Sequence, residues 1–376
     1  MKVLIIYASA GDGHRKATEA VYKAFLKSGT EAAEVEKIDA LNYTNFFFKI
    51  AYPSTYIFLV KYCPFLWGLF FHLLNLKAIA ALARGLRYCF NFLNGRKLIR
   101  YVLDKNPDVI ICAHFFSAQL IASLRIKSKL KGKVLCVVTD FGVHRFWINK
   151  GTDYYMVASD ITKKELETKG VPPDKIIVSG IPVEEKFSIP QSRTALRNKF
   201  GLEAELLTIL VMSGGFGVGP LKRIVHYLNA MVLPLQIVVI CGKNEKLYQY
   251  FAKSSFKKLV KVYGYVHNMD EFMSAADMIV SKSGGLTVSE SLVKALPMLI
   301  ISPIPGQEAR NAEVMSQCNA AIKIYHAVDL TKTIELLVKD NCSRLKEMKQ
   351  AAKVLSKPNA ANKICHWVKE NLLSRN

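Results

Sequence analysis

The pattern that decides the fold is clearest in the stretch Met278-Ile279-Val280-Ser281-Lys282-Ser283-Gly284-Gly285-Leu286-Thr287-Val288-Ser289-Glu290, where a short apolar run meets a glycine pair and then a helical pattern. Short runs rich in Val, Ile or Leu recur along the chain, and most are followed by a helical pattern. The predicted strands are residues 2–7, 108–113, 133–139, 153–158, 175–179, 206–212, 235–241, 259–263, 277–281 and 297–301. Strands that alternate with helices predict parallel sheets with helices on both faces.

The length of 376 residues suits two domains rather than one. The run from Gly180 to Ser192 interrupts the alternation and predicts a linker. We therefore expect an N-terminal domain over 1–185 and a second domain over 191–356. The chain after residue 325 reads as helix only, and we expect residues 357–376 to pack back toward the N-terminal domain. The apolar run at the N-terminus is too short for a signal peptide and resembles a first buried strand.

The net charge of +22 indicates an acidic partner. Residues 41–105 hold nine basic side chains, a single acid, Asp104, and 16 of the 39 aromatic residues. This mixture suits the interface between anionic headgroups and acyl chains, and it is too apolar for a nucleic-acid platform. The longest uncharged stretch, residues 62–76, is shorter than the about 20 residues of a spanning helix. We expect segments that lie on or dip into one leaflet, the alternative being an ordinary core.

A glycine-rich loop, Ser9-Ala10-Gly11-Asp12-Gly13-His14, follows the first predicted strand. It lacks the third glycine of a dinucleotide fingerprint, and no acid stands clearly at the end of a second strand. His14 lies where the first helix begins, and a helix N-terminus disfavours the imidazolium form. The residue is therefore either a neutral general base or a capping histidine. His114 and Asp140, which follow two other strands, are expected near His14, where one of them could orient His14 or an acceptor; a buried capping aspartate is the alternative.

Three loops of the second half also follow strands. Residues 212–220 carry four glycines but lack the Gly-Lys-Ser/Thr ending of the loop that binds phosphates in nucleotide hydrolases. They either cradle a diphosphate or form a flexible turn. Residues 283–290 open a helix whose free amides suit a diphosphate, with Glu290 able to accept the hydroxyls of a ribose. In residues 303–311, Gln307, Glu308 and Asn311 are suited to sugar hydroxyls. No pattern of metal ligands is visible, and the eight scattered cysteines indicate buried thiols in a reducing compartment.

These motifs, taken in order, resemble the glycosyltransferase family of monogalactosyldiacylglycerol synthases and processive diacylglycerol glucosyltransferases. They are more distantly similar to the N-acetylglucosaminyltransferase that makes lipid II. The residues that carry the resemblance are Gly11-Asp12-Gly13-His14-Arg15-Lys16-Ala17, Thr139-Asp140-Phe141 with His144 and Trp147, Gly180-Ile181-Pro182, Gly214-Gly215, residues 283–290, and Pro305-Gly306-Gln307-Glu308 with Asn311. Asp12 departs from the family loop, which is often richer in glycine; its carboxylate either raises the pKa of His14 or faces solvent.

The resemblance implies an α/β fold of the GT-B type, with two Rossmann-like, doubly wound parallel-sheet domains facing a cleft. It implies an inverting, metal-independent hexose transfer from a UDP-sugar, with His14 as the base and no cofactor. The residues implied to bind the donor are Gly214, Gly215, Val266, Ser283, Gly284, Gly285, Thr287, Glu290, Gln307, Glu308 and Asn311. The residues expected on the acceptor side are Gly13, His114, Asp140 and His144.

We hypothesise that the chain moves glucose or galactose from its UDP-sugar to diacylglycerol, as a peripheral protein on the cytoplasmic face of a membrane. Anionic lipids are the expected docking partner, and nucleic acid is not expected. Three alternatives stay open: a transferase that moves GlcNAc to a polyprenyl-linked acceptor, a UDP-sugar epimerase, and a membrane-bound sensor that binds without turnover.

Overall fold

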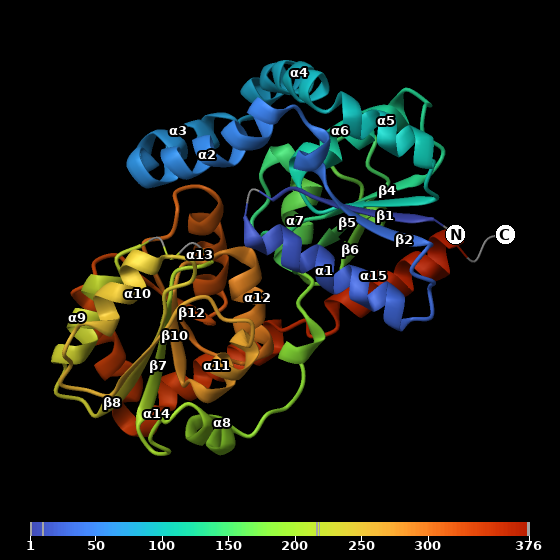
Figure 1. Cartoon of the computed structure of the whole chain (residues 1–376). Coiled ribbons are helices and arrows are strands. Elements are labelled where there is room, and N and C mark those ends of the chain that lie inside the picture. Colours follow the sequence, from blue (N-terminus) through green and yellow to red (C-terminus); the bar gives the residue numbers. More distant parts are fainter. Residues whose placement is uncertain (1, 10, 216, 218, 374–376) are drawn as a thin grey trace. The chain divides into compact units, whose positions relative to one another are not determined.

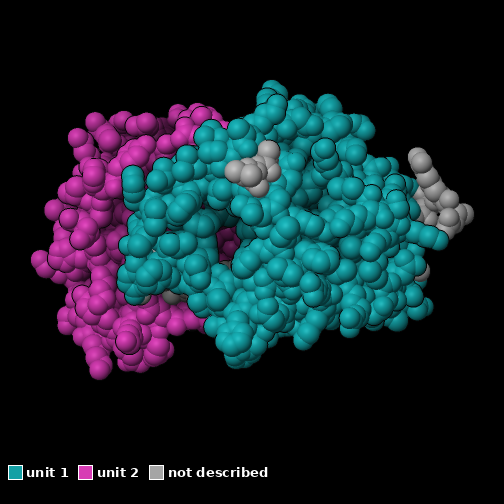
Figure 2. Space-filling model, turned by 90° about the horizontal axis from the view of Figure 1, so that it is seen from above, with its two compact units in different colours: residues 1–185, 305–307, 359–376 teal, residues 186–304, 308–358 magenta. Residues whose placement is uncertain are grey.

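The computed structural model describes residues 2–9, 11–215, 217 and 219–373 (Figure 1). Ala10, Phe216 and Val218, which belong to two of the predicted loops, fall outside the described residues. The chain divides into two compact units, which Figure 2 colours separately. The first unit comprises residues 1–185, 305–307 and 359–376, and the second comprises residues 186–304 and 308–358.

The first unit is built on a 6-stranded parallel sheet with the strand order β2-β1-β3-β4-β5-β6. Its strands are β1 (Val3–Tyr7), β2 (Val35–Asp39), β3 (Val109–Cys112), β4 (Lys133–Val137), β5 (Tyr154–Val157) and β6 (Ile176–Val178). Its helices are α1 (Asp12–Lys27), α2 (Phe46–Tyr62), α3 (Pro64–Leu73), α4 (Lys77–Asn94), α5 (Arg96–Lys105), α6 (Phe115–Ile126), α7 (Asp160–Thr168) and α15 (Ala360–Val368). Its short helical turns are η1 (Ala40–Tyr43), η2 (Arg145–Trp147), η3 (Pro173–Lys175) and η5 (Lys369–Leu373), and η4 (Glu185–Phe187) begins at the last residue before the chain enters the second unit.

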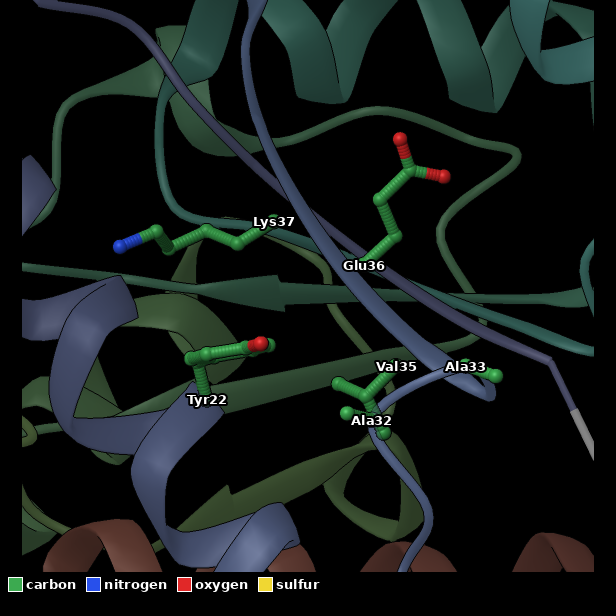
Figure 3. A pocket seen from close by; sticks show the side chains of 6 residues that line it. All are labelled: Tyr22, Ala32, Ala33, Val35, Glu36 and Lys37. Atoms are coloured by element: carbon green, nitrogen blue, oxygen red, sulfur yellow. The ribbon is translucent and has the colours of Figure 1, made fainter.

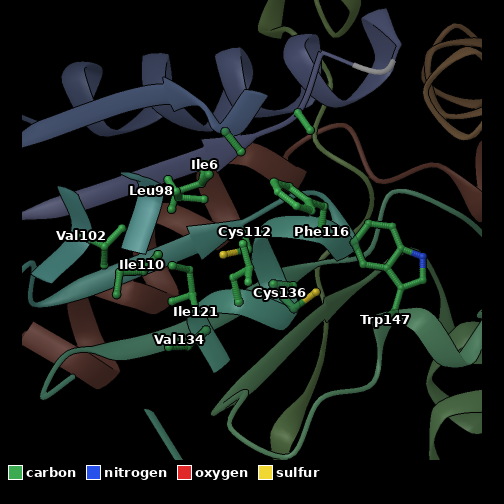
Figure 4. Packing of buried hydrophobic residues seen from close by; sticks show 14 of the residues in the cluster. Ile6, Leu98, Val102, Ile110, Cys112, Phe116, Ile121, Val134, Cys136 and Trp147 are labelled. Atoms are coloured by element: carbon green, nitrogen blue, oxygen red, sulfur yellow. The ribbon is translucent and has the colours of Figure 1, made fainter. Parts of the chain in front are cut away.

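Alternation along the strands gives this sheet two apolar faces. Val3 and Ile5 of β1 join a buried cluster with helices α1 and α15, whereas Leu4 and Ile6 join a second cluster with α5 and α6. Figure 4 shows the second cluster, in which Ile6, Ile110 and Val134 of the sheet meet Leu98, Val102 and Phe116 of the helices. Helices therefore cover both faces, as side chains of period two in a buried parallel sheet require.

The second unit repeats this plan with the strand order β12-β11-β10-β7-β8-β9. Its strands are β7 (Leu207–Met212), β8 (Leu235–Ile240), β9 (Val260–Tyr263), β10 (Met278–Ser281), β11 (Met298–Ile301) and β12 (Ala321–Ile324). Its helices are α8 (Arg193–Lys199), α9 (Leu221–Ala230), α10 (Glu245–Ala252), α11 (Met269–Ala275), α12 (Gly285–Val293), α13 (Gln307–Gln317) and α14 (Asp329–Leu355), the last interrupted by non-helical residues 339–342.

The ten predicted strands are confirmed to within one or two residues, but two strands were missed. Both β2, with the sequence VEKID, and β12, with the sequence AIKI, lie at the edge of a sheet. An edge strand is only partly covered, so it tolerates charged side chains such as Glu36, Lys37 and Lys323. Those charges break the apolar run by which buried strands are recognised.

Helix α15 supplies core residues to the first unit from the far end of the chain. Ile364 is fully buried against α1 and the sheet. We expect Ile364→Ala to lower the free energy of unfolding by about 2–5 kcal/mol because it leaves a cavity. Ile126→Ala, at a residue of the same type that is 60% exposed in the same unit, is the matched control and should cost less than about 0.5 kcal/mol.

Urea denaturation followed by tryptophan fluorescence measures this effect, since all three tryptophans, Trp67, Trp147 and Trp367, lie in the first unit. Equal midpoints for the two variants would show that α15 does not contribute to the core of that unit.

Candidate active site

His14 lies in the first turn of α1, and its ring is held by groups from other strand ends. Thr139, which follows β4, places its hydroxyl oxygen 3.0 Å from His14 Nδ1. The ring of His114 meets the His14 ring edge-on, with centroids 4.8 Å apart, and the Trp147 ring lies at 6.3 Å. The structure therefore brings together His14 and His114, as predicted, and adds Thr139 to them.

The surroundings of His14 keep it uncharged. Burial lowers the pKa of His14 to about 4, although a hydrogen bond to the Ala113 backbone favours the protonated ring. The sequence argument assigned this effect to the helix N-terminus, whereas burial is the leading cause in the structure. At neutral pH the ring has a free lone pair, which a general base requires.

Two further imidazoles of the acceptor side are buried. His114 caps α6: its Nδ1 accepts from the Phe116 amide at 3.1 Å, and burial lowers its pKa well below the usual range. His144 caps η2: its Nδ1 accepts from the Phe146 amide at 3.1 Å, and Nε2 lies 2.9 Å from the Phe71 carbonyl oxygen. The neutral ring of His144 therefore carries its proton on Nε2 and donates it to Phe71.

The remaining residues of the acceptor side are placed less directly. Asp140 is buried, at 7% exposure, and immediately follows Thr139. His144 is linked to His114 through the rings of Phe146 and Phe115, at centroid distances of 4.1, 5.7 and 4.2 Å along the chain of rings. Gly13 precedes His14 in α1.

The acids near the first loop have other partners. Asp12 forms an ion pair with Arg15 at 3.6 Å and is not among the groups that shift the pKa of His14. Asp39 ends β2, and its Oδ1 accepts from the amides of Ser9 and Leu41. The sequence analysis saw no acid clearly in the expected role at the end of a second strand; Asp39 occupies that position, which was overlooked because β2 itself had not been recognised.

In the second unit, the glycine-rich loop after β7 packs on the loop after β8. A Cβ on Gly217 would lie 2.2 Å from the Cys241 carbonyl oxygen, and one on Gly242 would lie 2.5 Å from that of Gly215. The Lys243 amide donates to the Gly215 carbonyl at 2.9 Å. Close packing of two backbones thus accounts for part of the glycine content. Gly214 has a φ of +64°, with open space where a side chain would lie.

The loops after β10 and β11 are joined by hydrogen bonds. Ser283 Oγ donates to the Glu308 carbonyl at 2.6 Å, and the fully buried Asn311 donates from Nδ2 to the Ser283 carbonyl at 3.0 Å. Glu308 Oε2 accepts from the Ile304 amide at 2.8 Å, while its Oε1 faces Gly284. The structure therefore brings Ser283, Gly284, Glu308 and Asn311 together beside the first turn of α12, where Gly285 is the first residue.

Lys282 is a residue of this region that the sequence analysis missed. Burial lowers the pKa of its ammonium group, and the Glu308 carboxylate acts in the opposite direction. A cation two residues before a glycine pair at a helix start was the signal that could have identified it, since such a group strengthens an anion site.

The structure describes no contact between the other predicted donor residues and the group formed by Ser283, Gly284, Glu308 and Asn311. Glu290 is buried in α12, at 4% exposure, and Thr287 lies one turn earlier. Val266 follows β9, and Gln307 opens α13. Within the described residues, no cluster of three His, Cys, Asp or Glu side chains has the arrangement of a metal site.

A separate hollow of about 410 Å³ lies on the first unit, at the edge strand β2. Figure 3 shows its lining, in which Tyr22 of α1 faces β2 at Val35 and Lys37, whereas the Glu36 side chain points away from Tyr22. An ion pair between Lys37 and Glu19 lies beside it. None of the predicted site residues lines this hollow.

Solved structures similar to this chain establish the class of the fold. MurG of Acinetobacter baumannii has a TM-score of 0.64 at 17% identity, over 98% of this chain and 100% of that one. The Staphylococcus aureus MnaA structure with UDP also has a TM-score of 0.64, at 13% identity, over 100% and 99%. With the two 6-stranded parallel sheets, these matches confirm the predicted GT-B fold of glycosyltransferases.

Sequence comparisons identify the family. Residues 14–183 match the model of monogalactosyldiacylglycerol (MGDG) synthase, and residues 208–364 match the glycosyltransferase family 28 C-terminal domain. A processive diacylglycerol beta-glucosyltransferase of Bacillus cereus is 31% identical over 96% of this chain and 92% of its own length. One of Bacillus thuringiensis is 30% identical over 98% and 93%. The chain belongs to this glycosyltransferase family, and it is a UDP-sugar-dependent hexosyltransferase.

The buried His144 predicts a pH-dependent stability. Burial lowers its pKa from 6.5 to about 4, so between these values the unfolded chain binds more protons and the free energy of unfolding falls as the pH is lowered. In His144→Asn, Oδ1 still accepts from the Phe146 amide but cannot titrate. We expect its slope of unfolding free energy against pH to be smaller by up to about 1.4 kcal/mol per pH unit. Urea denaturation of both proteins between about pH 4.5 and 6.5, where the folded and unfolded chains differ in the protonation of this histidine, tests the prediction. Equal slopes for the wild type and His144→Asn would contradict it.

Proposed function

We propose that the chain transfers a hexose, glucose or galactose, from its UDP-sugar to the free hydroxyl of diacylglycerol, with inversion and without a metal, at a membrane surface. The observation that carries this proposal is the uncharged His14 ring, enclosed by Thr139 and His114. The relatives of this chain, which are named processive diacylglycerol beta-glucosyltransferases, support the choice of acceptor.

In the proposed reaction the acceptor oxygen attacks the anomeric carbon from the face opposite UDP. The bond from carbon to the acceptor oxygen forms while the bond from carbon to the phosphate oxygen breaks. His14 takes the hydroxyl proton and later releases it to solvent. A neutral base suits this step, because a charged imidazole has no lone pair to accept the proton.

The charge that develops on the leaving diphosphate needs stabilisation in the second unit. The free amides at the start of α12, next to Ser283 and Gly284, suit an anion. Lys282 adds a cation whose burial makes an anionic ligand favourable. Glu290 and the joined residues Glu308 and Asn311 are proposed to contact the ribose and the sugar hydroxyls, as the family resemblance implies.

The membrane part of the proposal rests on helix α4, whose apolar side chains face solvent. Leu86, Phe90 and Leu93 are 71%, 58% and 59% exposed and follow one another at helical spacing. The opposite face carries Asn91, which is buried and donates to Gln119 Oε1 at 2.8 Å. A helix that buries amide groups and exposes leucine and phenylalanine matches a lipid surface rather than water.

Helices α2 and α3 extend this apolar surface. Phe46, Phe47 and Phe65 are more than two-thirds exposed, at 71%, 82% and 83%. No single helix within the described residues is long and apolar enough to cross a membrane; α2 and α3 together reach that length and composition but bend by 109°. Contact with one leaflet is the arrangement that we propose.

Incubation of the protein with each UDP-sugar and diacylglycerol in anionic vesicles, followed by thin-layer chromatography of the lipids, tests the activity. We expect a hexosyl-diacylglycerol product. We expect His14→Ala to lower kcat by about 100- to 10,000-fold, the usual contribution of a general base, with binding of UDP unchanged. His226→Ala, which removes an exposed histidine of the second unit, is the control.

Other outcomes of this assay identify the alternatives. A product that forms only from UDP-GlcNAc and a polyprenyl-linked acceptor would show that diacylglycerol is not the acceptor. Interconversion of UDP-sugars without lipid would indicate an epimerase, and binding without turnover a sensor. Near-normal turnover by His14→Ala would show that the base has been misassigned.

The apolar face of α4 predicts how the protein binds vesicles. We expect Leu86→Glu to weaken binding to phosphatidylglycerol-containing vesicles at least about tenfold, because a buried leucine contributes about 2 kcal/mol and a carboxylate is repelled by anionic lipid. Leu336→Glu, at an exposed leucine of α14, is the matched control. Co-sedimentation measures binding, and equal loss in both variants would show that the effect is one of charge alone.

A further inference from the structure

Thr139 has a single described role for its side chain. It is the second residue after β4, is 6% exposed, and makes a hydrogen bond to His14 Nδ1 at 3.0 Å. The two residues are 125 positions apart in sequence, so this contact is a product of the fold.

We propose that Thr139 is a positioning residue for the base: its hydroxyl oxygen accepts the Nδ1–H of His14 and leaves Nε2 as the nitrogen that takes the acceptor's proton. This inference rests on the proposed function, in which His14 is the general base.

The argument follows from the two nitrogens of a neutral imidazole, of which one carries a proton and the other a lone pair. Nδ1 is already engaged with Thr139, so the nitrogen that meets the substrate hydroxyl is Nε2. Nε2 accepts a proton only if its lone pair is free, which places the ring proton on Nδ1. A hydroxyl can accept that proton, and in doing so it selects both the tautomer and the orientation of the ring.

Neighbouring groups restrict the ring further. The Ala113 backbone also makes a hydrogen bond to the ring, one that favours its protonated form. His114 stands edge-on at 4.8 Å, with its own Nδ1 occupied by the Phe116 amide. The sequence analysis expected Asp140 or His114 to orient His14; Thr139, the residue before Asp140, was not among those expectations and makes a hydrogen bond to the ring.

A hydroxyl differs from a carboxylate in this role because it carries no charge. It fixes the ring while stabilising the imidazolium much less than a carboxylate would, so the base stays neutral over a wide range of pH. A carboxylate at the same place would raise the pKa of His14. The residue type at position 139 therefore controls the pH at which the enzyme loses its base.

Three substitutions test this role by kinetics. Thr139→Val, which keeps the shape and removes the acceptor, should lower kcat about tenfold, the equivalent of one neutral hydrogen bond, with the KM for UDP-sugar unchanged. Thr139→Ser should restore most of the activity and shows that the position tolerates substitution. Thr139→Asp should move the acid limb of the kcat/KM profile to higher pH than in the wild type, where the pKa of His14 is about 4.

A second measurement does not depend on activity. Nitrogen NMR of the protein labelled with ¹⁵N-histidine, with His14→Gln used to assign the signals, reports which ring nitrogen carries the proton. We expect the Nδ1–H tautomer in the wild type and in Thr139→Ser, and its loss in Thr139→Val. A wild-type ring protonated on Nε2, or full kcat in Thr139→Val, would overturn the proposal even if His14→Ala is inactive. Near-normal turnover by His14→Ala would instead remove the proposed base itself.

Discussion

Parallel pairing of β1, β3 and β4 is the constraint on which the candidate site depends. Ile6 pairs with Cys112, and Cys112 pairs with Cys136, so the three strands are in register. Parallel strands release their next residues at the same edge of a sheet. The loop that leads to His14, the cap of α6 at His114 and the hydroxyl of Thr139 therefore converge, although no two of them are near in sequence.

The same sheet edge determines which groups lie beside the proposed base, His14. Asp12 and Asp39 both lie by the first loop, but Arg15 and the amides of Ser9 and Leu41 already hold their carboxylates. The described contacts of the His14 ring are with a hydroxyl, an imidazole, an indole and the Ala113 backbone. Burial among uncharged groups disfavours the imidazolium, so the pKa falls instead of rising as it would beside a carboxylate.

The sequence predicted the buried parts of the fold and the loops at strand ends, because apolar runs and glycine-rich turns are local signals. It did not reveal β2, whose charged residues are tolerated at a sheet edge. It placed His14 and His114 together from the order of the strands, but the contact with Thr139 depends on side-chain direction, which no spacing encodes. Lys282 has a local signal, its place before a glycine pair at a helix start, but its burial and the nearby Glu308 carboxylate depend on the fold.

The neutral groups around His14 and the exposed apolar face of α4 both suit an uncharged lipid acceptor. A diacylglycerol headgroup is an uncharged hydroxyl, and moving it from the interface into a protein costs least where the protein offers apolar contact and neutral partners. Helix α4 exposes Leu86 and Phe90 outward and keeps Asn91 inside. A charged base would bind counter-ions and water, which the acceptor would then have to displace. The proposed base, half-buried, neutral and hydrogen-bonded to a hydroxyl, would have neither cost, and it would acquire charge only when the acceptor releases its proton.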